Sequence, residues 1–156
     1  MNTPGGFPLH HMLITLLRVT LGCVFIVASI DKIADPYAFA ASIGNYKIVS
    51  GTPAMFVATI LPWIELLAGL GLLFGVFLRG SALLTLIMLA TFTILASSAM
   101  LRGLDISCGC FTQDPASSKV GWTKIAENLL LIAINIIVFS RSSEKLSLDR
   151  FVRQRQ

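Results

Sequence analysis

Four long apolar runs constrain this chain more than any other feature of its sequence. They cover about residues 13–30, 56–78, 81–100 and 120–139, and most charged residues lie between them. A helix needs about 20 mostly apolar residues to cross a bilayer, and none of the runs alternates as a barrel strand does. Helices satisfy their own backbone hydrogen bonds in hydrocarbon. The sequence therefore predicts an all-α bundle of four transmembrane helices.

Composition and length agree with one integral membrane domain over residues 1–156. Only 13% of the residues are charged, against about 25% in a soluble domain. The net charge of +4 comes largely from a basic tail, residues 141–156, which follows the last apolar run. Such a tail is typical of contact with anionic lipid headgroups, so nucleic acid is not an expected partner. No Lys or Arg precedes the first run, which is therefore predicted to be an anchor and not a cleaved signal peptide.

A short helix is predicted between the first two runs. Asp35 suits a helix N-cap, and Pro36 suits the first helical position. Phe39, Ile43 and Tyr46 then fall on one face at helical spacing. This pattern predicts an interfacial helix with its apolar face toward the lipid. An ordinary loop is the alternative.

Four spans place both termini on one side of the membrane. That side carries six basic residues, namely Arg79, Arg141, Lys145, Arg150, Arg153 and Arg155, and the other side carries five, namely Lys32, Lys47, Arg102, Lys119 and Lys124. The positive-inside rule then favours cytoplasmic termini in the inner (plasma) membrane of a bacterium. Aromatic residues near the opposite face, Tyr37, Tyr46, Trp63 and Trp122, predict an interfacial belt there.

The loop between the third and fourth runs holds two cysteines, Cys108 and Cys110, separated by one glycine. With cytoplasmic termini they face the periplasm, where thiols can be oxidised. A disulfide between them would close a small, strained ring that is easily reduced, which suits a redox carrier better than a structural staple. Arg102 is near enough in sequence to favour a thiolate. Asp105 would oppose that effect or move protons.

Three other interpretations of the cysteines stay open at this point: idle loop thiols, a fixed disulfide, or a metal site. Structural zinc needs four ligands. Cys23 lies inside the first run and is expected to be a buried apolar residue, while His10 and His11 precede that run on the opposite side. No metal site is therefore predicted.

Charged residues inside the spans are functional candidates because their burial in lipid is costly. Arg18 and Glu65 are expected to differ in depth by roughly 7 Å, which long side chains can bridge, so an ion pair between them is predicted. A separate role for Glu65 is the alternative. Gly71 and Gly75 form a GxxxG pattern, which suggests close helix packing and a homodimer as one outcome.

Polar residues near the outer face complete the candidate set. Glu127 and Asn128, two turns into the last run, are candidates for hydrogen bonding to a quinone headgroup or for proton transfer. The alternative is a helix–helix hydrogen bond, which is also expected for Asn135. Asp31 and Lys32, at the outer end of the first run, are expected to form a solvated pair.

Several motifs resemble the MauE branch of the DoxX-like membrane proteins. They are residues 31–39, LPWIEL at 61–66, RGLDISCGCF at 102–111, VGW at 120–122 and EN at 127–128. The resemblance implies a four-helix inner-membrane protein associated with redox processes. It also implies that Cys108 and Cys110 are the redox pair, and that the protein assists disulfide formation in, or export of, the small subunit of methylamine dehydrogenase.

Together these observations lead to a working hypothesis of thiol–disulfide exchange. Electrons would pass from a periplasmic redox or substrate protein to an acceptor in the membrane, with a quinone suggested by analogy to other four-helix disulfide-forming proteins. A non-catalytic assembly factor is one alternative. A small transporter that uses Glu65 and Arg18 is another.

Overall fold

The computed structural model describes residues 9–103 and 122–141, with side chains from residue 12 onward. Its helices are α1 (Leu9–Ala34), α2 (Pro36–Asn45), α3 (Thr52–Phe74), α4 (Leu78–Leu101) and α5 (Trp122–Arg141). All except α2 are long and apolar enough to cross a membrane. The prediction of an all-α bundle with four spans is confirmed.

The second predicted span differs from the observed helix at both ends. Helix α3 begins earlier, at Thr52, because Pro53 fits the first turn of a helix. It ends at Phe74, because Gly75 takes a left-handed conformation with φ of 73°. The predicted run over 56–78 therefore extended across the turn between α3 and α4. Apolar content could not reveal this turn, since its residues are themselves mostly apolar.

The short helix predicted between the first two spans is confirmed as α2. The Asp35 side chain accepts a hydrogen bond of 2.9 Å from the backbone N–H of Ala38, and Pro36 occupies the first helical position. The apolar face of α2 was predicted to meet the lipid, and this part of the prediction is wrong. Phe39 and Tyr46 are buried as α2 packs against α3. The local capping signals were sufficient here because they act within one turn.

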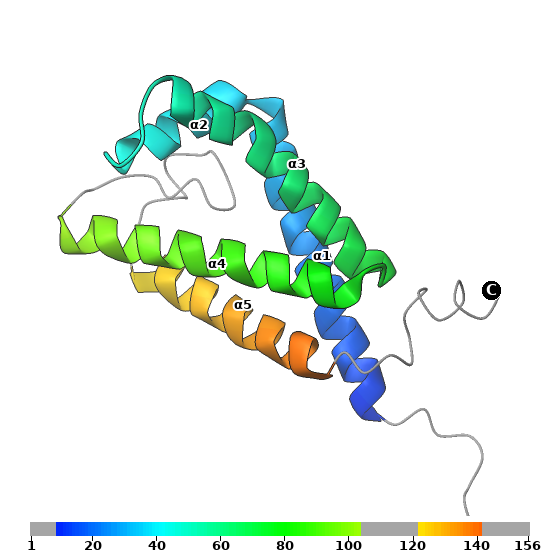
Figure 1. Cartoon of the computed structure of the whole chain (residues 1–156). Helices are drawn as coiled ribbons and strands as arrows, with labels where there is room; N and C mark the ends of the chain where they lie inside the picture. Colours follow the sequence, from blue (N-terminus) through cyan, green and yellow to red (C-terminus); the bar gives the residue numbers. More distant parts are fainter. Residues whose placement is uncertain (1–8, 104–121, 142–156) are drawn as a thin grey trace, which may run out of the picture.

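The spanning helices form two antiparallel pairs (Figure 1). Helices α1 and α3 lie side by side, and the pair of α4 and α5 lies across them. Their core takes one buried side chain from each of the four spans: Leu21, Leu72, Ala82 and Val138. A second cluster of Phe25, Met88 and Leu89 continues this core. The buried interior therefore lies where the two pairs cross.

Close contact between α1 and α3 depends on two glycines. A Cβ atom on Gly22 would lie 2.9 Å from the carbonyl oxygen of Gly69, and one on Gly69 would lie 3.0 Å from the carbonyl oxygen of Gly22. The GxxxG glycines have other neighbours within the chain. Gly71 faces Ser81 of α4, and Gly75 faces Arg18 of α1. The GxxxG pattern therefore no longer supports the predicted homodimer, because both glycines pack within one chain.

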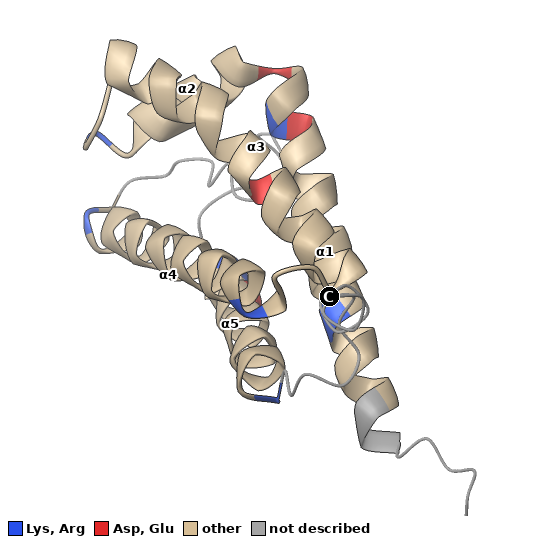
Figure 2. Cartoon of the chain, turned by 45° about the vertical axis from the view of Figure 1, so that its right-hand side comes forward, with Lys and Arg blue, Asp and Glu red and all other residues tan. Residues whose placement is uncertain are grey.

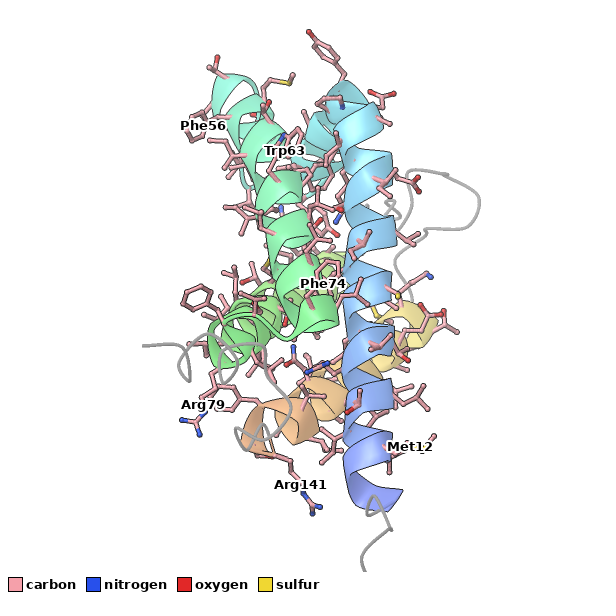
Figure 3. The ribbon with its side chains drawn as sticks, turned by 90° about the vertical axis from the view of Figure 1, so that its right-hand side faces the viewer. Met12, Phe56, Trp63, Phe74, Arg79 and Arg141 are labelled. Carbon is pink, nitrogen blue, oxygen red and sulfur yellow. The ribbon has the colours of Figure 1, made fainter. Side chains whose placement is uncertain are left out.

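Large apolar side chains cover the outside of the spans. On α3, Phe56, Trp63 and Phe74 are each more than half exposed, and Figure 3 shows Phe56 projecting from the side of the helix. Cys23 is also exposed, so its predicted burial is wrong. Its neighbours on α1, Leu21 and Gly22, take the inward positions instead. An apolar exterior of this kind is what lipid contact requires.

The predicted aromatic belt is only partly exposed. Tyr37, Trp63 and Trp122 face outward, whereas the ring of Tyr46 is buried. Tyr46 therefore contributes to packing between helices and not to an exposed belt.

Candidate functional site

Three of the predicted site residues, Cys108, Cys110 and Asp105, lie outside the described residues. The chain on either side of them is described. Helix α4 ends, and α5 begins, at the end of the bundle where α2 lies (Figure 1). This end is opposite the turn between α3 and α4. The connection that carries the Cys-Gly-Cys motif therefore joins two spans at the α2 end.

A hydrogen bond fixes the point at which this connection leaves α4. Nη1 of Arg102 donates to the carbonyl oxygen of Tyr46 at 3.0 Å, which links the end of α4 to the end of α2. Gly103 then takes a positive φ of 66°. Burial raises the pKa of the Tyr46 phenol to about 12. Arg102 was predicted to act on the thiols through its charge. Among the described residues its side chain instead bonds the Tyr46 carbonyl and so joins α4 to α2.

A buried ion pair joins α1 and α3. Nζ of Lys32 lies 2.8 Å from both carboxylate oxygens of Glu65. Lys32 is 0% exposed and Glu65 is 1% exposed. The predicted solvated pair of Asp31 and Lys32 is therefore wrong. Asp31 is exposed, but Lys32 lies on the inward face of a helix that continues to Ala34.

Two aromatic rings enclose the Lys32 ammonium. Its Nζ lies 5.1 Å from the centroid of Phe39 on α2 and 5.0 Å from that of Phe92 on α4. The negative faces of such rings attract a cation, and more strongly where water is excluded. Four helices, α1 to α4, therefore meet at one charge. Because the Glu65 carboxylate neutralises the Lys32 ammonium, the ion pair places no net charge in the hydrocarbon.

The predicted Arg18–Glu65 pair is wrong. Arg18 lies beside Gly75, where a Cβ atom would be 2.7 Å from Nη1 of the arginine. Gly75 is ten residues beyond Glu65, or roughly 15 Å further along the helix axis. The register of α1 against α3 thus carries Arg18 past Glu65 and brings Lys32 to it.

Glu127 and Asn128 do not form one polar pair. Glu127 is exposed and pairs with Lys124, with 2.9 Å between Oε2 and Nζ, whereas Asn128 is buried. Neighbouring residues on a helix point about 100° apart. These two side chains therefore do not fit a shared site for a quinone headgroup.

The helix–helix hydrogen bond expected for Asn135 is confirmed. Its side-chain amide on α5 lies 2.8 Å from the hydroxyl oxygen of Thr85 on α4. With the amide oxygen toward Thr85, the amide nitrogen donates to the carbonyl of Ala82 at 3.1 Å. This contact joins the two helices that flank the cysteine connection.

Comparison with known proteins decides the family. The family model described as methylamine utilisation protein MauE matches residues 10–141, which is most of the chain. The chain belongs to the MauE family. The MauE protein of Paracoccus denitrificans is 26% identical over 135 residues, which cover 86% of this chain and 72% of that protein. The MauE protein of Methylophilus methylotrophus is 28% identical over 117 residues, which cover 74% of this chain and 61% of that protein. No solved structure matches this chain.

Lys32 is the residue of this MauE-family chain that sequence reasoning missed. A signal for it existed. Lys32 follows Leu21, Phe25 and Ser29 at helical spacing, and all three are buried on the same face of α1. The neighbouring Asp31 favoured a solvated pair instead, because opposite charges adjacent in sequence suggest a helix end at the membrane surface.

Proposed function

We propose that this MauE-family protein exchanges thiols and disulfides with a partner protein through Cys108 and Cys110. The observation that carries the proposal is that α4 ends and α5 begins at the α2 end, and these are the two helices between which the cysteines lie in the sequence. This end is opposite the end where Arg79 and Arg141 lie (Figure 3). Basic ends of membrane proteins favour the cytoplasm. Orientation in the inner membrane by this rule would expose the cysteines to the oxidising periplasm.

The proposed exchange needs only protein sulfurs. A thiolate of the partner attacks the Cys108–Cys110 disulfide and forms a mixed disulfide. The partner's second thiolate then attacks the mixed disulfide and releases this chain. The partner gains a disulfide, and Cys108 and Cys110 become thiols that hold the two electrons and two protons. Reoxidation requires a two-electron acceptor in the membrane, for which a quinone is the proposed class.

The proposed partner is a periplasmic protein rich in disulfides. The relatives carry names that refer to methylamine utilisation, and the family resemblance implies the small subunit of methylamine dehydrogenase. We therefore propose that the chain supports maturation of such a subunit. The buried state of Glu65, which Lys32 neutralises, argues against a transporter that uses Glu65 and Arg18.

Differential thiol alkylation in intact cells tests the redox role. In oxidised cells Cys108 and Cys110 are expected to form a disulfide and to resist alkylation. Added reductant should make both thiols available to the alkylating reagent, and added oxidant should protect them again. Cys108→Ser and Cys110→Ser should each abolish this change and leave the partner's thiols reduced. Cys23→Ser is the matched control, because Cys23 is an exposed thiol on α1 and should leave both readouts unchanged.

Two results would contradict the redox role. If the state of the pair never responds to oxidant or reductant, the exchange is excluded. If both serine variants still support maturation of the partner, the protein is a non-catalytic assembly factor.

A further inference from the structure

Among the described residues, basic side chains outnumber acidic ones at the end of the bundle opposite α2. Arg79 at the start of α4 and Arg141 at the end of α5 are both exposed, and Figure 3 shows them at the same end. Figure 2 shows the basic residues of the described chain in blue. Within the described ranges, Glu65 and Glu127 are already paired with lysines. No described carboxylate forms an ion pair with Arg79.

A third arginine, Arg18, is buried at the same end of the bundle as Arg79. Arg18 is only 9% exposed and lies against the turn between α3 and α4, beside Gly75. Its Nε has no hydrogen-bond acceptor within the described part of the chain. A buried cation with an unsatisfied donor is unstable unless a negative charge lies nearby. An anion bound at the turn would provide that charge.

The same turn exposes aromatic rings beside the arginines. Phe77 is 74% exposed, and Phe74 also faces outward. Phe77 has a φ of 47°, in the left-handed region that bulky residues avoid. A free inorganic anion would contact the arginines alone. A phospholipid has both a phosphate for the arginines and acyl chains for the rings.

We propose that the turn between α3 and α4 binds the headgroup of an anionic phospholipid. Arg79 contacts the phosphate, Arg18 adds charge from behind, and Phe74 and Phe77 lie among the acyl chains. This lipid site involves described residues alone and does not depend on the thiol–disulfide function.

The test is lipid retention by the full chain. The protein is reconstituted in vesicles of phosphatidylcholine and phosphatidylglycerol and extracted in mild detergent, and bound lipid is measured by native mass spectrometry. The wild type should retain phosphatidylglycerol preferentially. Arg79→Gln should reduce that preference about fivefold, as expected for one basic residue near a membrane surface. Lys47→Gln is the matched control, since Lys47 is exposed at the α2 end, and should change nothing.

Two further measurements distinguish a bound lipid from a free anion and from an effect of overall charge. Phe77→Gly removes the ring and relieves the backbone strain, so it should lower phosphatidylglycerol retention while leaving thermal stability unchanged or higher. Excess inorganic phosphate should not displace the lipid. Displacement by phosphate would indicate a free-anion site and overturn the proposal. An equal loss in Lys47→Gln would show an effect of overall charge and would also overturn it.

Discussion

The ammonium of Lys32 lies 2.8 Å from both carboxylate oxygens of Glu65, with the two side chains only 1% and 2% exposed. In hydrocarbon neither charge can be left alone at low cost. The two residues therefore act as one neutral unit. The rings of Phe39 and Phe92 extend this unit to α2 and α4.

Breaking this pair should destabilise the protein strongly, and removing both charges should restore most of the loss. Lys32→Met and Glu65→Leu should each cost about 3–5 kcal/mol, because each leaves one charge buried without a partner. The double variant should approach wild-type stability, because well-packed apolar residues can replace a buried ion pair. Unfolding by detergent titration, followed by circular dichroism, gives the coupling free energy.

The Lys124–Glu127 pair is a control within the same chain. It has the same residue types at 2.9 Å, but its side chains are 20% and 53% exposed. The corresponding double-mutant cycle, Lys124→Met with Glu127→Leu, should give a coupling of about 0–1 kcal/mol. A coupling at Lys32–Glu65 no larger than this would contradict the view that the buried pair acts as a unit.

The sequence predicted those features of the fold that depend on local pattern. The four spans follow from apolar length, and α2 follows from Asp35 and Pro36, which act within one turn. The partner of Glu65 could not be predicted, because it depends on the register between α1 and α3. That register is fixed by close backbone contact at Gly22 and Gly69, which no single helix reveals.

Because α1 and α3 are in close contact at Gly22 and Gly69, adding a side chain at either glycine should destabilise the protein. A Cβ atom on Gly69 would meet the carbonyl oxygen of Gly22 and the Ile26 side chain, each at 3.0 Å. Gly69→Ala should therefore cost about 1–3 kcal/mol through overpacking, despite the better helix propensity of alanine. Because α1 must move, it should also weaken the Lys32–Glu65 coupling.

Gly80→Ala is the matched control. Gly80 also lies in a helix, α4, but a Cβ atom there would have no neighbour within 4 Å. This substitution should stabilise the protein by up to about 1 kcal/mol, because alanine loses less conformational entropy on folding. Detergent-unfolding curves of the two variants should thus shift in opposite directions. A shift of the same sign in both would contradict the close packing of α1 against α3.

The buried phenol of Tyr46 should make stability fall at alkaline pH. Its pKa is raised from 10.0 to about 12 by burial, so the folded state holds the neutral phenol more tightly than the unfolded chain does. The resulting stabilisation is complete below about pH 10 and is lost as the pH rises through 12. Tyr46→Phe has no phenol to ionise, so between these limits wild type should lose up to about 3 kcal/mol more than this variant does. Unfolding free energies at several alkaline pH values, with the phenolate absorbance difference between the two proteins, measure this effect. Parallel pH profiles for wild type and Tyr46→Phe would contradict the burial of the phenol.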